Sequence, residues 1–237
     1  MKFPDPLIAG RLIKRYKRFM ADVALKDGTV VTAHCANSGS MLGLTEPGAL
    51  VWLSPARNPD RKLKYTWELI RIGHTLVGVN TSLANKLVLE AINAGRVPEL
   101  SGYDKILGEV KYGKNSRIDF LLEGGGGPPC YVEIKSVTLK RDLSPTAPVE
   151  FPDAVTTRGT KHLRELSAMA DQGRRAVMFY LVQRQDGPAF TIAGDIDPDY
   201  AAALKTAMKA GVEVLCYSCK LTEREIILER PLKTRLM

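Results

Sequence analysis

Two short runs in which apolar and polar residues alternate flank a tract of glycine and proline. This stretch restricts the possible folds more than any other part of the chain. Residues 117–122 (RIDFLL) and 130–138 (CYVEIKSVT) alternate in the manner of β-strands. Residues 124–129 (GGGGPP) lie between them. The stretch therefore predicts a β-hairpin with a long tip.

This hairpin carries charged side chains among its apolar ones. Because side chains alternate between the two faces of a strand, Glu133 and Lys135 point to the same side, with Cα atoms about 6.6 Å apart. A hairpin that folds symmetrically about Gly126 places Asp119 across from Glu133. One face is thus predicted to hold two carboxylates and one ammonium group. The opposite face would hold Ile118, Phe120, Val132 and Ile134.

The chain length permits one large domain or two smaller ones. With 237 residues, 45% of them hydrophobic and 25% charged, the chain can bury real cores and has an ordinary globular composition. The charge balance is less ordinary, since 34 Lys and Arg against 26 Asp and Glu give a net charge of +8 and a pI near 9.3. This balance favours a polyanionic partner, and a generally basic protein without such a partner is the alternative.

Nothing in the sequence indicates export or a membrane span. The first residues contain prolines at positions 4 and 6, and no apolar run has the length of a signal peptide or of a membrane span. We therefore expect a cytoplasmic protein with no membrane partner. Four cysteines do not indicate a disulfide scaffold, and the CxxC at 216–219 has no second pair or histidine cluster beside it. Neither zinc binding nor a redox role is expected.

The first 80 residues have the pattern of a small β-barrel. Asp27-Gly28 is a typical hairpin signal between two strand-like runs. An OB-fold-like barrel over residues 1–80 suits the number of strands, and such barrels often bind oligonucleotides. The five predicted strands are at residues 19–25, 29–34, 50–53, 63–72 and 75–79.

Two basic clusters lie within this segment, and in the first of them cations alternate with aromatic rings. Cations neutralise phosphates and aromatic rings stack on bases, so the clusters favour nucleic-acid contacts. The alternative is a solvated helical face, because Leu12, Tyr16 and Met20 also have helical spacing. The predicted contact residues are Lys14, Arg15, Tyr16, Lys17, Arg18, Arg61 and Lys62.

The hydrophobic period changes from strand-like to helical near residue 80, where we place a domain boundary. A helix from Thr81 or Ser82 to Gly95 would carry Glu90 beside its apolar stripe, where Glu90 could lean toward the hairpin. Residues 139–159 contain three prolines and predict a long irregular connection. Residues 81–237 thus form a mixed α/β domain. Its other elements are predicted at residues 105–111, 160–173, 176–183, 198–211, 212–218 and 225–228.

The carboxylates of the hairpin face suggest a metal site. Asp119 and Glu133 would repel each other unless a cation or a proton lies between them. Mg²⁺ or Mn²⁺ fits, because such ions prefer oxygen ligands and are often held by one or two carboxylates together with phosphate. Lys135 could orient a water and offset charge that develops on a phosphate during hydrolysis. Glu90 would add a further carboxylate if its helix packs beside the hairpin, and a position on the surface is the alternative. The alternative is a plain salt bridge between Lys135 and Glu133.

This arrangement resembles the PD-(D/E)xK nuclease core, in which Asp119, Glu133 and Lys135 would be the motif residues and Glu90 the acidic residue of the preceding helix. Over nearly its full length, the chain also resembles the sugar fermentation stimulation protein family. The segments that carry this resemblance are HCANSGSML (34–42), VNT (79–81), GEVKYGKNSRIDFLL (108–122), YVEIKSVTL (131–139), FPDAVTTRGTKHL (151–163) and AVMFYLVQR (176–184).

The resemblance implies an OB-fold-like N-terminal barrel, a mixed α/β restriction-endonuclease-like second domain, DNA binding and a regulatory role in sugar (maltose) metabolism. Cations near the acidic cluster could grip the flanking phosphates. These are Lys114, Arg117, Arg158 and Lys161, with His162 either beside them or facing solvent.

Three functions stay open at this stage. The first is a Mg²⁺- or Mn²⁺-dependent nuclease that binds DNA with little sequence specificity. The second is a DNA-binding regulator of sugar metabolism that does not cut. The third is an RNA-binding or RNA-processing protein. The sequence leaves the oligomeric state open.

Overall fold

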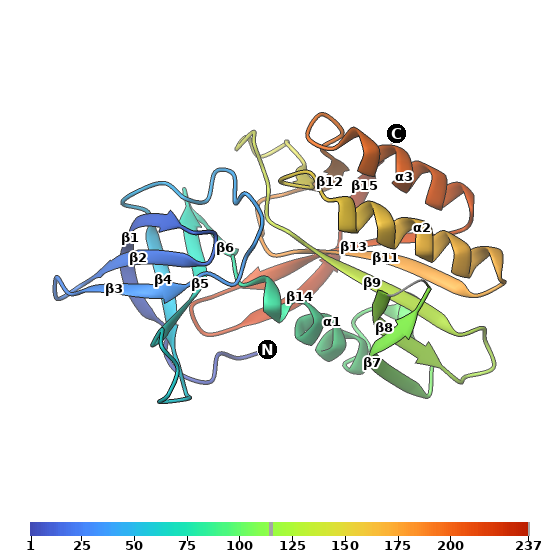
Figure 1. The fold of residues 1–237 in the computed structure, drawn as a ribbon, viewed down its shortest axis with the longest axis horizontal. Coiled ribbons are helices and arrows are strands. Elements are labelled where there is room, and N and C mark those ends of the chain that lie inside the picture. Colours follow the sequence, from blue (N-terminus) through green and yellow to red (C-terminus); the bar gives the residue numbers. More distant parts are fainter. Residues whose placement is uncertain (114–115, 237) are drawn as a thin grey trace.

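The computed structural model describes residues 1–113 and 116–236, which form a β-barrel followed by an α/β domain (Figure 1). The barrel strands follow the order β3-β2-β1-β4-β5-β6, and a pairing of β3 with β5 closes the barrel. These strands are β1 (Ile8–Tyr16), β2 (Met20–Leu25), β3 (Val30–His34), β4 (Leu50–Pro55), β5 (Tyr65–Ile72) and β6 (Thr75–Gly78).

Strand β1 is absent from the sequence-based prediction, and the structure explains why. Gly10 and Leu12 are buried and alternate with exposed residues, as a strand requires. The register shifts between Leu12 and Lys14 at a β-bulge, so the period of two is interrupted within the basic run. Because of the bulge, the apolar residues from Leu12 to Met20 have a spacing that also fits a helix. The helical alternative for this cluster is therefore wrong.

A six-stranded sheet with the order β14-β13-β11-β9-β8-β7 forms the centre of the second domain. Its strands are β7 (Lys105–Tyr112), β8 (Ser116–Glu123), β9 (Cys130–Val137), β11 (Arg175–Val182), β13 (Glu213–Leu221) and β14 (Ile226–Pro231). Strand β11 runs parallel to both β9 and β13, and its side chains are buried along nearly its whole length. This agrees with the continuous apolar run in its sequence.

Helices cover both faces of this sheet (Figure 1). On one face, α1 (Ala84–Asn93) follows the short 3-10 turn η1 (Thr81–Leu83) and packs into a core that includes Leu87 and Val88. A second 3-10 turn is η2 (Pro98–Leu100). On the other face lie α2 (Thr157–Asp171) and α3 (Pro198–Lys209), which bury Leu163 and Leu204. None of the helices in the described part of the chain is long and apolar enough to cross a membrane.

Three short strands that the sequence does not predict form a separate small sheet. They are β10 (Val149–Phe151), β12 (Ala189–Ile192) and β15 (Lys233–Arg235), in the order β10-β12-β15. Helix α2 also begins three residues before the predicted start at Thr160, because the Thr156 side chain caps it by accepting from the Gly159 N–H.

The β8–β9 hairpin has the predicted register. Phe120 pairs with Val132 and Leu122 with Cys130, which corresponds to folding about Gly126. Its tip needs glycine, because Gly125 has a φ of 69° and a Cβ there would lie 1.6 Å from the Gly102 carbonyl oxygen. The tract of glycines thus sets the turn that brings the two charged strands together.

The barrel and the α/β domain share buried contacts at their junction. Trp52 and Leu69 of the barrel belong to the same core cluster as the apolar face of α1. Buried Glu68 accepts from the Asn80 side-chain amide at 2.8 Å, and the Asn80 side-chain oxygen accepts from the Ser82 N–H at the start of η1. The capping residue is thus Asn80, one residue before the expected Thr81 and two before the expected Ser82. These contacts tie β5 to the chain that enters the second domain.

Glu68 should make the stability of this junction pH-dependent. Burial raises the pKa of Glu68 above its usual 4.5, and hydrogen bonds from Ser54 and Asn80 oppose the shift. A raised pKa in the folded state means that the fold favours protonated Glu68. The contribution of Glu68 to the free energy of unfolding is therefore fully present below the unfolded-state pKa and is lost as the pH rises through the folded-state pKa. We expect E68Q to gain stability relative to wild type between about pH 4 and pH 7. Urea unfolding at both pH values measures this, and exposed E46Q should show no such gain.

Candidate functional site

The charged face of the hairpin opens into a pocket of about 430 Å³ between the barrel and the α/β domain. Helices α1 and α2, strand β9 and the segment 151–156 supply most of its walls. The barrel supplies Arg18 and residues 37–39. Asp119, Glu133 and Lys135 all line this pocket, as the hairpin register predicts.

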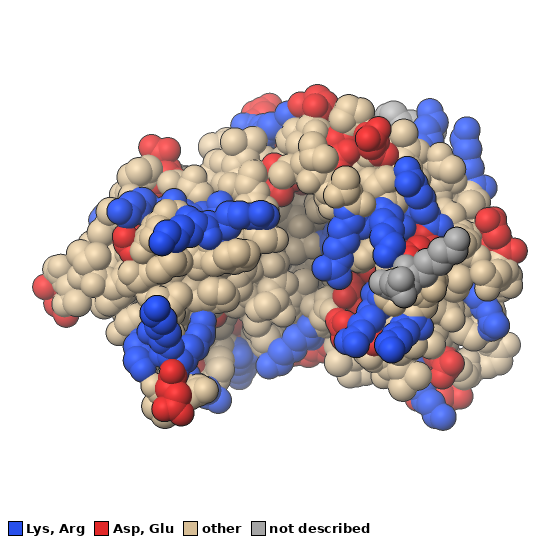
Figure 2. Space-filling model, viewed as in Figure 1, with Lys and Arg blue, Asp and Glu red and all other residues tan. Residues whose placement is uncertain are grey.

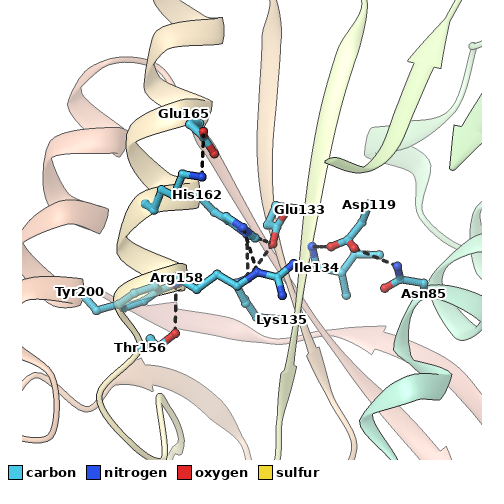
Figure 3. A network of polar contacts seen from close by, with 12 residues as sticks. Asn85, Asp119, Glu133, Ile134, Lys135, Thr156, Arg158, His162, Glu165 and Tyr200 are labelled. Carbon is cyan, nitrogen blue, oxygen red and sulfur yellow. Dashed lines mark hydrogen bonds and ion pairs between the residues drawn. The ribbon is translucent and has the colours of Figure 1, made fainter. Parts of the chain in front are cut away.

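Glu133 lies at the centre of a buried polar cluster (Figure 3). Its side chain is only 3% exposed, and its Oε1 atom accepts from Lys135 Nζ at 2.6 Å. The same oxygen contacts His162 Nδ1, and Lys135 Nζ lies 3.3 Å from that ring nitrogen. Lys135 from β9 and His162 from α2 thus meet at the Oε1 atom of Glu133.

His162 belongs to this cluster, so the alternative of a solvent-facing histidine is wrong. The residue is 4% exposed. Its Nε2 atom accepts from Arg158 Nε at 3.3 Å, one helical turn earlier, which matches the tautomer with the proton on Nδ1, facing Glu133. The spacing from Leu163 and Leu166 places His162 at the edge of the buried face of α2. That spacing was the available sequence signal.

Asp119 interrupts the pairing of β8 with β9. The strand ladder ends at Phe120, and the Asp119 Oδ2 atom accepts from the Ile134 N–H at 2.7 Å. Its Oδ1 atom accepts from the Asn85 amide of α1 at 2.9 Å. The two carboxylates therefore have different partners, and Asp119 turns toward α1 whereas Glu133 turns toward α2 (Figure 3).

The pKa values of the two carboxylates shift in opposite directions. Burial and the nearby charge of Glu133 raise the pKa of Asp119, and the hydrogen bonds from Ile134 and Asn85 only partly oppose this. Burial also acts to raise the pKa of Glu133, but His162 and Lys135 outweigh burial and lower that pKa. Glu133 is thus held as an anion, and its charge makes a second negative charge on Asp119 costly.

One atom of this cluster is left without a partner. Glu133 Oε2 is buried and makes no hydrogen bond to any residue that the structure describes, although a buried carboxylate oxygen normally has a partner. A divalent cation would satisfy that oxygen and relieve the repulsion between Glu133 and Asp119. Among residues 1–113 and 116–236, no group of three or more acidic, histidine or cysteine side chains could hold a metal by itself. The orphaned Glu133 oxygen and the Asp119 carboxylate, which line the same pocket, fit a divalent cation whose other ligands are water or phosphate oxygens.

Glu90 does not join the pocket, so its predicted position is wrong. It is on α1, but its Oε1 atom accepts from the N-terminal amine of Met1 at 2.6 Å, and its side chain is 44% exposed. The apolar stripe of α1 faces the sheet, and Glu90 lies at the border of that stripe beside the N-terminus. Asn85, one and a half helical turns earlier, is the α1 residue that reaches Asp119.

Arg18 and Arg158 are the predicted nucleic-acid contacts that line the pocket. Lys161 is on the outer side of α2 and pairs with Glu165 at 3.7 Å. Arg117 is exposed on β8, and Lys114 lies outside the described residues. The structure thus brings the barrel arginine and the α2 arginine to one pocket, whereas Arg117 and Lys161 are exposed and do not line it.

The remaining barrel residues have mixed positions. Arg15 donates to the carbonyl oxygens of Asn37 and Gly39, both at 2.9 Å, so it holds the backbone of that loop. The Tyr16 hydroxyl donates to Asp22, and the ammonium of Lys14 lies over the Tyr16 ring. Lys17 and Lys62 are exposed, as predicted for surface contacts. Arg61 is partly buried and donates to the Thr66 hydroxyl.

Family models match both parts of the chain. The model described as the sugar fermentation stimulation protein RE domain matches residues 82–225, and the model described as the SfsA N-terminal OB domain matches residues 13–79. The chain belongs to the sugar fermentation stimulation protein family. Its barrel is OB-fold-like, and its second domain is a mixed α/β domain of the restriction-endonuclease-like class, as the sequence predicts.

Several relatives are similar over nearly the full length. A sugar fermentation stimulation protein homolog from Rhodospirillum rubrum is 61% identical, with 93% of each chain covered. A homolog from Maricaulis maris is 55% identical over 100% of this chain and 99% of its own. The structure of Pyrococcus furiosus SfsA in complex with Ca²⁺ superposes with a TM-score of 0.89 at 27% identity and covers 99% of this chain and 98% of that one. The family assignment therefore extends to the whole fold.

Proposed function

We propose that this protein binds DNA in the hollow between its two domains and hydrolyses a phosphodiester bond with the help of Mg²⁺ or Mn²⁺. The observation that carries the proposal is the buried, unpartnered Oε2 atom of Glu133, which lies in one pocket with Asp119 and Lys135. A related protein from Pyrococcus furiosus was solved in complex with Ca²⁺, which supports a divalent-metal site in this family.

Asp119 and Glu133 are the residues that would hold the metal, which would supply Lewis-acid stabilisation to the reacting phosphate. Lys135 contributes a positive charge at its Nζ atom, 2.6 Å from Glu133 Oε1, where negative charge on a phosphate oxygen is favoured. His162 positions Glu133 through its Nδ1 contact, and Glu133 in turn accepts from Lys135. The Asn85 amide and the Ile134 N–H hold Asp119 in its orientation.

The surface charge supports a DNA-binding role. Figure 2 shows Lys and Arg side chains on both sides of the hollow that separates the barrel from the α/β domain in this view. A DNA strand in the hollow would have phosphates near cations of both domains, and such contacts depend on salt and not on base sequence. Binding with little sequence specificity is the form that this charge pattern favours.

A non-catalytic DNA-binding regulator is the second candidate. It is favoured by the ion pair between Lys135 and Glu133, because this contact alone gives both residues a structural role. A role in regulating sugar metabolism in the cytoplasm would fit either candidate. An RNA-binding or RNA-processing protein differs in its use of the 2′-hydroxyl, which makes RNA a direct comparison in the same assay.

The test combines cleavage with binding. Wild-type protein is incubated with single-stranded DNA, duplex DNA and RNA of one sequence, with Mg²⁺, with Mn²⁺ or with EDTA. We expect cleavage of DNA that requires the metal, and binding that weakens steeply as salt rises. Binding without cleavage of any substrate would favour the regulator. Preference for RNA in both assays would favour the third function.

A further inference from the structure

We propose that Arg18 of the barrel and Arg158 of α2 together clamp the phosphate that reacts at the Asp119–Glu133 site. The barrel would then be part of the catalytic site and not only a surface that holds DNA nearby. This inference rests on the proposed function, since it names the groups that bring an anionic strand to the two carboxylates. Both arginines line the same pocket as those carboxylates.

The charges in the pocket require additional cations. Asp119, Glu133 and Asp153 line it, and their carboxylates repel an incoming phosphate. Lys135 is close to Glu133, and a metal would offset part of the remaining negative charge. A phosphodiester carries its own negative charge into this site. Guanidinium groups suit this task, because their planar donors bind phosphate in a bidentate manner.

Arg18 and Arg158 both have donors to spare. Arg18 Nη2 donates to the Ser38 carbonyl oxygen at 2.8 Å, and Arg158 Nε donates to His162 Nε2 at 3.3 Å. Neither guanidinium pairs with a carboxylate within residues 1–113 and 116–236. Since a guanidinium has five N–H donors, most of those on each side chain remain available for a ligand.

The backbone that carries Arg18 is held in an unusual conformation. Lys17 and Arg18 have φ angles of 49° and 63°, in the left-handed region that glycine adopts at lower cost. Arg15 stabilises this turn by donating from Nη2 to the Arg18 carbonyl oxygen at 2.9 Å. Non-glycine residues persist in this region where their surroundings fix them, often at functional sites. The turn thus sets the direction in which the Arg18 side chain leaves the backbone, and the contact with the Ser38 carbonyl oxygen holds its guanidinium.

The loop beneath Arg18 is also fixed to the α/β domain. Ser40 Oγ donates to the Asp153 carbonyl oxygen at 2.5 Å, and the Met41 N–H donates to Asp153 Oδ2 at 2.9 Å. Gly39 lies so close that a Cβ there would be 2.6 Å from that same carboxylate oxygen. These contacts attach the barrel loop to the segment that leads into α2. They pre-organise Arg18 and Arg158 around one pocket.

The test compares two adjacent glycine substitutions in the full-length protein. Both Arg18→Gly and Lys17→Gly remove one positive charge from the same turn, and both relieve its left-handed backbone. Of these two residues, Arg18 lines the pocket and Lys17 does not. Binding of a fluorescent 12-nucleotide single strand and of its duplex is titrated with NaCl in Ca²⁺ buffer, and a gel after each titration checks that the probes are intact. Cleavage is followed separately in single-turnover reactions with Mg²⁺ or Mn²⁺.

We expect R18G to weaken binding of the preferred probe about tenfold, as for loss of a charged hydrogen bond, and to flatten the salt dependence by about one phosphate contact. Cleavage should fall about 10²-fold further than in K17G. Equal losses in R18G and K17G would overturn the clamp. If wild type binds but does not cut, the nuclease function fails while the binding comparison still decides the clamp. If wild type binds neither probe at low salt, both proposals fail.

Discussion

Replacing Glu133 with glutamine is expected to abolish metal-dependent cleavage of DNA while DNA binding survives. Glutamine keeps the shape of the side chain but loses the anionic charge on Oε2, which has no hydrogen-bond partner in the described part of the chain. Loss of the metal's charge stabilisation corresponds to several kcal/mol, or a rate loss of about 10³-fold. Single-turnover cleavage measures the rate, and fluorescence anisotropy at low salt measures the binding. Because Glu133 contributes a negative charge to the pocket, binding should stay equal or become tighter.

Glu90→Gln is the matched control for this experiment. It makes the same chemical change in the same domain, but Glu90 contacts the N-terminal amine and not the pocket. Cleavage by E90Q should stay within about twofold of wild type, as expected for a partly exposed ion pair. Equal losses in E90Q and E133Q would contradict the site described above. Full activity in E133Q would remove Glu133 from the chemistry altogether.

The hairpin was predictable because its determinants are local. A strand has a period of two, so the register about Gly126 fixes which residues stand opposite each other. The glycines with positive φ at the tip leave little choice of turn. Asp119, Glu133 and Lys135 therefore reach one pocket, as predicted. What the register does not reveal is that Asp119 leaves the ladder to accept from the Ile134 N–H.

The misplaced and missed residues depend on contacts between distant parts of the chain. Glu90 turns to an N-terminal amine 89 residues away, and no local pattern contains that amine. Asn85 is an uncharged residue, and its role in the site comes from its hydrogen bond to Asp119, which no local pattern indicates. His162 faces inward because it is next to Leu163 and Leu166 on the side of α2 that packs into the core. Tertiary packing decides what each face of a helix contacts. The helical period of a sequence therefore predicts an apolar stripe, but not which residues of other elements lie against it.

Arg184→Met is expected to destabilise the folded protein by about 3 kcal/mol, the lower part of the range for breaking a buried ion pair. Arg184 is 1% exposed. It donates from Nε and Nη2 to the Asp186 carboxylate at 2.6 and 2.8 Å, and from Nη1 to the Thr138 carbonyl oxygen at 2.7 Å. Lys140 lies 3.8 Å from Asp186 and would still offset part of its charge, which is why the lower value is expected.

Arg141→Met is the matched comparison, because Arg141 also pairs with two carboxylates, those of Glu150 and Asp195. The Arg141 side chain is 37% exposed, so water replaces its contacts and the loss should be about 1 kcal/mol or less. Urea unfolding of both variants measures the difference through the midpoint and the slope. A larger loss in R141M than in R184M would show that burial is not the deciding factor.

The double variant R184M/D186N separates lost contacts from the cost of an unpaired charge. Arg184 lowers the pKa of Asp186 against the effect of burial, so the pair contributes stability above the unfolded pKa that is lost as the pH falls through the folded value. Removing both charges should therefore recover part of the stability that R184M loses. No recovery would mean that the Thr138 contact carries the effect. Because the Arg184 side chain donates to Thr138, which directly follows β9, R184M should also slow cleavage by loosening the strand that holds Glu133 and Lys135.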